Sequence, residues 1–308
     1  MLLIMGCRYN GLGSTDTARY YLGMEYAISS DSWSEYYHPD RSESGFQMFV
    51  FLLSRVFTHP QWLLAITSLI FIVSIFYFID RNSNEIAVST SLYITLGMMI
   101  FQLQGMRQAL AMSLCLFAYE LARKKKLIWF LLVVFLAATF HQTAIVFVIV
   151  YLLANLRLSV RNVIFVAVIS FVAVFFSIPL VDIANNLFDK SYDGAVESGG
   201  LVATAIYVLA LIVCCIYYST HKEDARSPLV YVMIVGAATY FMRYTGVQIA
   251  ERISFYFAFS QIALIPVAVQ FDPKAKSITR GIIVLLGVAL LAYRLGDSGF
   301  LPYAFFWD

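Results

Sequence analysis

Long apolar runs alternate with short polar loops over most of the chain. A transmembrane helix needs about 20 mainly apolar residues, because the hydrocarbon core of a bilayer is about 30 Å thick. Runs of suitable length and composition cover residues 61–79, 86–103, 107–122, 162–181, 201–219, 228–244, 253–271 and 278–294. The pattern predicts an all-α polytopic membrane protein with about 9–11 transmembrane or re-entrant helices.

Two apolar stretches do not fit a simple crossing. Residues 45–58 are too short for an easy crossing and contain Arg55, so we expect an interfacial or re-entrant helix there. Residues 127–156 would reach about 45 Å as one helix, well beyond the hydrocarbon core. The polar sequence around His141 interrupts this run near its middle. We therefore predict a hairpin of two short helices with His141 at the turn.

The basic residues of the short loops set the predicted orientation, because such loops stay in the cytoplasm. The strongest marker is the run Arg-Lys-Lys-Lys at residues 123–126. If that loop lies inside and residues 127–156 form a hairpin, further basic residues come to the same side: Arg81, Arg157, Arg161, Lys222, Arg226, Lys274, Lys276 and Arg280. The N-terminal segment 1–44 and the acidic loop 182–200 are then expected on the outer face.

We expect one integral membrane domain over residues 1–308, since the crossings leave little chain for a separate soluble domain. A polar segment of about 44 residues on the outer face usually needs an upstream helix to carry it across the membrane. Only residues 1–5 precede the first polar motif, and they look like the end of a helix. We therefore expect that the given start lacks a preceding transmembrane helix.

The composition restricts the class of protein further. Hydrophobic residues make up 61% and charged residues 13% of the 308 residues, against about 45–50% and about 25% in soluble proteins. A soluble enzyme is thereby excluded, so an active site must lie within or beside the membrane. The net charge of +2 and the lack of a basic, aromatic-rich run exclude nucleic-acid binding. The four cysteines show no ligand spacing and indicate neither a zinc site nor a disulfide framework, and we expect no metal and no cofactor.

Ionisable residues gather on the predicted outer side of the membrane. They are Arg8, Asp16, Glu43, Arg107, His141, Arg243, Glu251 and Arg252. Charged groups at helix ends or inside spans are costly, and they tend to line a functional cavity or to pair with one another. The predicted topology therefore indicates a functional site on this side.

Each of these residues also has a structural alternative. Arg107 at a helix end can reach lipid headgroups, and Arg243 beside a tyrosine can anchor the chain in the aromatic belt. Arg252 directly follows Glu251, and adjacent side chains diverge on a helix, so Arg252 can reach a ligand or pair with a distant acid. His141 can cap a helix through a ring nitrogen, or it can act as a base because its unperturbed pKa lies near neutrality.

Several short motifs follow one another over nearly the whole chain. In order they are Arg8 with Gly11, Gly13-Ser14-Thr15-Asp16-Thr17 with Tyr20, Glu43-Ser44-Gly45-Phe46, Arg107-Gln108, Phe140-His141-Gln142-Thr143-Ala144, and Glu251-Arg252-Ile253-Ser254-Phe255-Tyr256-Phe257. Together they resemble the EpsG family, multispanning bacterial proteins regarded as Wzy-like polymerases of exopolysaccharide and capsule. In that family the N-terminal pattern usually follows a first transmembrane helix, and the acidic motif usually reads Glu-Pro-Gly-Phe.

The resemblance implies a glycosyl transfer at the outer leaflet of the bacterial plasma membrane. A glycan on undecaprenyl diphosphate would move onto the end sugar of another lipid-linked repeat unit, and the lipid diphosphate would leave. Fixed arginines would stabilise the leaving diphosphate, with Arg107 and Arg252 as first choices and Arg8 and Arg243 next. The expected partners are this lipid-linked oligosaccharide, the lipid bilayer and other polysaccharide assembly proteins.

The acceptor hydroxyl needs a base or an orienting acceptor in such a reaction. Asp16, Glu43 and His141 are candidates, in no order that the sequence can justify. A flippase or transporter of lipid-linked sugars would use the same arginines, but the chain shows no clear internal repeat and its polar residues lie at one face. A membrane acyltransferase acting on glycans is a third possibility, with His141 as its base. The several arginines fit a diphosphate better than a thioester.

Overall fold

The computed structural model describes residues 1–12, 15–39, 43–188, 200–221, 224, 226–241, 248–296 and 300–308. These residues are mainly helical and contain no strand; one isolated bridge joins Arg8 to Phe305. In chain order the elements are α1 (Leu2–Gly6), α2 (Thr15–Ser29), α3 (Trp33–Tyr36), α4 (Ser44–Ser54), α5 (Gln61–Asn82), α6 (Ile86–Thr95), α7 (Met98–Gln104), α8 (Met106–Arg123), α9 (Leu127–Phe140), the 3₁₀ helix η1 (Gln142–Val148), α10 (Ile149–Leu153), α11 (Val160–Phe188), α12 (Gly200–Thr220), α13 (Leu229–Phe241), α14 (Gln248–Leu264), the 3₁₀ helix η3 (Ile265–Gln270) and α15 (Lys276–Gly296).

The apolar helices confirm the predicted all-α polytopic membrane architecture. Within the described ranges, three helices are long and apolar enough to cross a membrane: Gln61–Asn82, Arg252–Gln270 and Lys276–Gly296. The bent pair α6 and α7 passes the same test as one unit. Six shorter apolar helices accompany them: Ser44–Ser54, Leu127–Phe140, Gln142–Leu153, Val160–Ala173, Thr204–Thr220 and Leu229–Phe241. These elements fit a polytopic membrane protein, and the expected total of about nine to eleven transmembrane or re-entrant helices stays a prediction.

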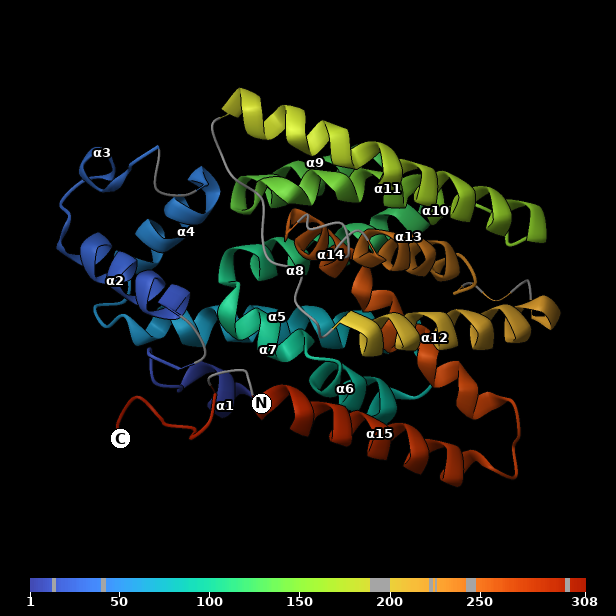
Figure 1. The fold of residues 1–308 in the computed structure, drawn as a ribbon. Helices are drawn as coiled ribbons and strands as arrows, with labels where there is room; N and C mark the ends of the chain where they lie inside the picture. Colours follow the sequence, from blue (N-terminus) through green and yellow to red (C-terminus); the bar gives the residue numbers. More distant parts are fainter. Residues whose placement is uncertain are drawn as a thin grey trace.

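The bundle is built around α8, and α11 and α15 lie along opposite margins of it (Figure 1). Most side chains of α8 are buried, whereas α15 buries only Gly287. A mainly exposed apolar helix is what a lipid-facing position requires. α11 continues to Phe188, so the predicted outer loop 182–200 begins inside a helix, and residues 189–199 lie outside the described part.

The predicted span 86–103 is not one straight helix. It breaks between α6 and α7, which are bent by 50° to each other. Gly97 at the break has φ 84°, a left-handed conformation that glycine adopts without steric cost. The Leu96 carbonyl, which the break leaves without a helical partner, accepts a hydrogen bond from Arg294 of α15. A second break at Gly105 separates α7 from α8 and places the start of α8 at Met106.

The predicted hairpin at residues 127–156 is confirmed. α9 ends before His141, whose backbone is extended, and the chain then returns through η1 and α10. Tyr151 lies on the return arm, and its hydroxyl donates to the carbonyl of Lys125 at 3.2 Å. Lys125 lies just before the outward arm begins. The Asn155 side-chain amide likewise donates to the Ala122 carbonyl at 3.0 Å. The two arms therefore begin and end at the same end of the molecule.

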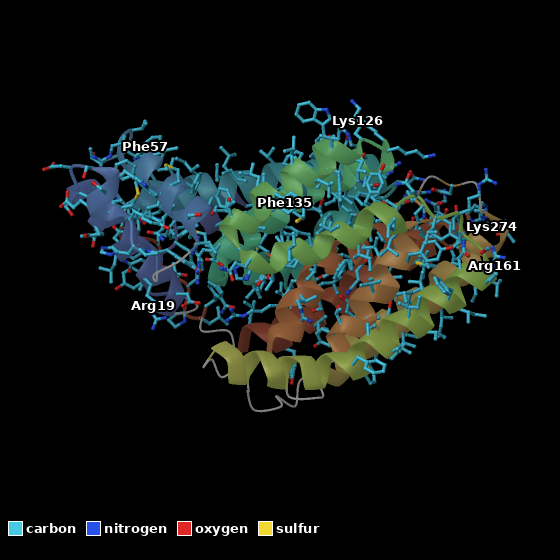
Figure 2. All side chains as sticks on the ribbon, turned by 90° about the horizontal axis from the view of Figure 1, so that it is seen from above. Arg19, Phe57, Lys126, Phe135, Arg161 and Lys274 are labelled. Atoms are coloured by element: carbon cyan, nitrogen blue, oxygen red, sulfur yellow. The ribbon has the colours of Figure 1, made fainter. Side chains whose placement is uncertain are left out.

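The loops predicted to be cytoplasmic contact one another at that end. Arg280 of α15 donates to both carboxylate oxygens of Glu85 at 2.8 and 2.9 Å. The Tyr231 hydroxyl donates to the Arg157 carbonyl at 2.8 Å. Figure 2 shows Arg161 and Lys274 at one end of the molecule and Arg19 and Phe57 at the other. Lys126 lies between these two ends in the same view, so the figure places Arg161 and Lys274, but not every predicted basic loop, at one end.

The N-terminal helices and the C-terminal segment pack together at the opposite end (Figure 1). The Tyr9 amide donates to the Ala304 carbonyl at 3.0 Å, beside the bridge between Arg8 and Phe305. Buried side chains from α1, α2 and α4 join those of α5 and α8 in one hydrophobic cluster, which includes Met5, Met24, Val50, Leu64 and Ala109. α4 covers only Ser44–Ser54, which as a helix spans about 17 Å and agrees with an interfacial or re-entrant element.

The hairpin predicts which residues can be labelled from each side of the membrane. In a variant lacking the four native cysteines, a cysteine replacing exposed Gln142 should react from the outer side. Cysteines replacing exposed Lys125 and Lys274 should react only from the cytoplasmic side. The measurement is labelling of oriented vesicles by a membrane-impermeant thiol reagent. Reaction of position 142 from the same side as position 125 would contradict the topology.

Candidate functional site

A carboxylate, an arginine and a histidine from three distant segments meet beside the N-terminal helices. Oε2 of Glu43 lies 2.6 Å from Nη1 of Arg107, and Oε1 of Glu43 lies 3.0 Å from Nδ1 of His141. The side chains of Glu43 and His141 are 12% and 11% exposed, whereas that of Arg107 is 30% exposed. We call Glu43, Arg107 and His141 the outer cluster.

Gly45 explains how Glu43 comes so close to His141. Glu43 immediately precedes α4, and α4 packs on the end of α9, where His141 follows. A Cβ atom on Gly45 would lie 2.1 Å from the Thr139 hydroxyl oxygen and 2.8 Å from the Thr139 carbonyl carbon. Only glycine therefore permits this approach of the first turn of α4 to the last turn of α9.

The break at Gly105 places Arg107 in the first turn of α8. The Leu103 carbonyl at the end of α7 accepts hydrogen bonds from Nη2 of Arg8 and from the Thr17 hydroxyl, both at 3.1 Å. Arg8 is buried and also donates to the Met5 carbonyl. The Arg8 guanidinium thus binds the backbone carbonyl groups of Met5 and Leu103. Among the described residues, no interaction joins Arg8 to Glu43, Arg107 or His141.

The charge of Glu43 determines the tautomer of His141. Burial raises the pKa of Glu43, but the hydrogen bond from His141 and the charge of Arg107 outweigh it and lower that pKa to about 2. An ionised carboxylate only accepts hydrogen bonds, so Nδ1 of His141 carries the proton. In the neutral ring Nε2 then has a free lone pair. This Nε2 is buried and has no hydrogen-bond partner among the described residues.

Two residues of α2 approach the cluster from the exposed side. Tyr20 lies beside Arg107; burial raises the pKa of its hydroxyl, and Arg107 opposes that rise. The Tyr20 ring packs edge-on against Phe46 of α4, with centroids 5.4 Å apart. Asp16 lies one helical turn before Tyr20, is half exposed, and pairs with exposed Arg19 at 3.6 Å. Asp16 therefore lies at the rim and not within the outer cluster.

α14 places the backbone of Arg252 against Gln108, the neighbour of Arg107. Gln108, the residue after Arg107, donates through its side-chain amide to the Arg252 carbonyl. Four residues further on, the Tyr256 hydroxyl accepts from the Thr143 hydroxyl at 3.3 Å, next to the turn at His141. The Arg252 side chain is exposed. One helix thus contacts the segments that carry two members of the cluster.

The sequence of the whole chain was compared with models of known protein families. The model of the EpsG family matches residues 1–305, nearly the whole chain. The chain belongs to the EpsG family. No curated protein and no solved structure matches it significantly.

The EpsG-family motifs contain several residues whose structural roles sequence reasoning missed. Gln108, Thr143 and Tyr256 lie in these motifs, and all three connect α14 to the surroundings of the cluster. Polar groups in otherwise apolar helices could have marked these three residues as candidates for a structural or functional role. Arg243 and the side chain of Glu251 lie outside the described part of this EpsG-family chain. Among the residues described, no group of three or more His, Cys, Asp or Glu side chains is placed to hold a metal ion.

The close contact at Gly45 predicts a destabilising substitution. Gly45→Ala should lower the melting temperature of the detergent-solubilised protein, because overpacking typically costs about 1–3 kcal/mol and the added Cβ meets backbone. Gly23→Ala in α2 is the matched control, since a Cβ there meets nothing within 4 Å. That control should be neutral or stabilising by up to about 1 kcal/mol. Equal melting temperatures for Gly45→Ala and wild type would contradict the packing.

The depressed pKa of Glu43 predicts a pH dependence of stability. Because the pKa is lowered from 4.5 to about 2 in the folded protein, the ion pair stabilises fully above pH 4.5. That contribution is lost as the pH falls toward 2. The melting temperatures of wild type and Glu43→Gln should therefore differ above pH 4.5 and converge below it. A difference that persists unchanged down to pH 2 would show that it does not come from ionised Glu43.

Proposed function

We propose that this protein is a polysaccharide polymerase of the bacterial plasma membrane. It would transfer a glycan from a lipid diphosphate onto another lipid-linked repeat unit at the outer leaflet. Membership in the EpsG family suggests a polymerase-like role. The single observation that carries the proposal is the outer cluster, in which one carboxylate orients an imidazole with one oxygen and holds an arginine with the other.

His141 is the proposed base for the acceptor sugar. A carboxylate bonded to Nδ1 orients an imidazole and stabilises its protonated form, as in hydrolases that use Nε2 as a base. In this reaction Nε2 takes the proton of the acceptor hydroxyl while the hydroxyl oxygen attacks the anomeric carbon of the donor. Asp16 is a weaker candidate, because it is half exposed and paired with Arg19.

Arg107 and Arg252 are the proposed partners of the leaving diphosphate. The bond between the anomeric carbon and the phosphate oxygen breaks, and its electron pair leaves with the lipid diphosphate. Guanidinium groups bind phosphate oxygens through parallel donors, and they stabilise developing charge strongly where water is scarce. Arg243 stays a candidate from its sequence position. Arg8 contributes indirectly, since its donors hold the backbone at the start of α8.

The position of the cluster favours chemistry over transport. The outer cluster lies at the starts of α4 and α8, next to Tyr20 of α2, whereas Arg161 and Lys274 lie at the end of the molecule away from Arg19 of α2 (Figure 2). A flippase needs groups that hold the diphosphate, but it has no need of an oriented base. An acyltransferase would use a base, yet Arg107, which is bonded to the same carboxylate as His141, matches a diphosphate better than a thioester.

Lysine substitutions test the role of the arginines. Arg107→Lys and Arg252→Lys should each lower the rate of polymerisation by about 10²–10³, because an ammonium lacks the parallel donors of a guanidinium. The measurement is the ladder of products made from a purified lipid-linked repeat unit at matched protein amounts. Arg280→Lys is the control, since Arg280 pairs with Glu85 at the opposite end and should leave the ladder unchanged.

Two results would count against this function. Unchanged ladders for both lysine variants would show that these arginines only reach lipid headgroups, which lysine also does. In cells, an inactive polymerase should leave single repeat units on the outer leaflet. Accumulation on the inner leaflet in the His141→Gln strain would instead identify a flippase.

A further inference from the structure

Arg107 holds Glu43 through one guanidinium nitrogen, as Arg123 holds Glu120, whereas two other described arginines hold a carboxylate through two. Arg280 holds Glu85, and Arg226 holds Asp224, each through two guanidinium nitrogens. Arg107 contacts Glu43 through Nη1. A guanidinium has five N–H donors; Glu43 accepts from one nitrogen and the Tyr20 hydroxyl also bonds to this side chain, so further donors of Arg107 are not used by the carboxylate.

Arg107 is also the member of the outer cluster that is most open to solvent. Its side chain is 30% exposed, against 12% for Glu43 and 11% for His141. A ligand that enters the cluster therefore reaches the guanidinium before it reaches the carboxylate or the imidazole. Glu43 is itself held by a second contact, because its other oxygen is bonded to His141.

We propose that Glu43 occupies the anion site of Arg107 in the empty protein, and that a phosphate oxygen of the lipid-linked diphosphate displaces it. Glu43 then keeps its hydrogen bond to His141 through the other oxygen. This exchange rests on the proposed function, since it names the diphosphate as the incoming anion. It assigns Glu43 a second role, as an internal competitor for the donor substrate.

The exchange is physically reasonable, because Arg107 has an anionic partner in both states. A partly buried charge without a partner is costly, and the carboxylate avoids that cost before substrate binds. A diphosphate carries more negative charge than one carboxylate and offers more acceptor oxygens. Once released from Arg107, the carboxylate keeps His141 as its hydrogen-bond partner and holds Nδ1–H in place.

Pyrophosphate binding to the detergent-purified full chain tests the exchange. Glu43→Gln removes the competing charge, so inorganic pyrophosphate should bind about tenfold more tightly than to wild type. The rate of polymerisation should fall in the same variant, because a neutral amide orients and stabilises His141 poorly. Glu85→Gln is the matched control, since it removes a carboxylate from the Arg280 pair at the opposite end and should change neither quantity.

A second substitution separates exchange from simple repulsion between Glu43 and pyrophosphate. In an Arg107→Gln background, the further change Glu43→Gln should no longer tighten binding by about tenfold, because no arginine is left to compete for. A gain of the same size in that background would overturn the exchange. Glu43→Asp keeps the charge but is one methylene too short to hold both partners, so it should also bind pyrophosphate more tightly than wild type.

The outcomes distinguish this inference from the proposed function. Pyrophosphate affinity that is unchanged or weaker in both Glu43→Gln and Glu43→Asp would overturn the exchange, even if wild type makes a full ladder. Tighter binding in these variants, with no ladder from any lipid-linked repeat unit in wild type, would support the exchange and refute the polymerase. A wild type and a Glu43→Gln variant that both fail to bind pyrophosphate would overturn the exchange as well.

Discussion

The Glu43 carboxylate is shared by two partners whose segments lie far apart in the chain. One oxygen bonds to Arg107 and the other to His141, so the start of α4, the start of α8 and the end of α9 are fixed relative to one another. In a poorly hydrated site, removal of one charge would leave the other uncompensated. The packing of these three helices and the charge balance of the cluster therefore depend on the same two contacts of Glu43.

The membrane helices could be predicted largely from local sequence, because a bilayer imposes a length and an apolar composition on each crossing. The hairpin was also predictable, since one polar sequence around His141 interrupts a run too long for a single helix. The break at Gly97 could not be predicted from the sequence. Its surroundings are mainly apolar, and glycine is common in membrane helices. The bend is supported by Arg294 from α15, a contact between residues almost 200 positions apart that no local pattern reveals.

The members of the site could be predicted, but their relationships could not. Glu43, Arg107 and His141 were recognisable because ionisable residues are rare in such a chain. Their pairing depends on the contact of Gly45 with α9, which arises only when the helices pack. Arg8 has the same side chain as Arg107, yet its donors serve backbone carbonyls at a helix break. Residue type alone could not separate these two roles.

The hairpin made of α9, η1 and α10 has a consequence for how the chain can vary. Because both arms meet the rest of the molecule at the same end, the segment adds no net crossing of the membrane. An insertion, deletion or exchange of residues 127–154 as a block would leave the orientation of every other helix unchanged. His141 lies at the far tip of that block. The histidine is thus carried on a hairpin of its own, while Glu43 and Arg107 lie at the starts of the helices α4 and α8, against which the hairpin packs.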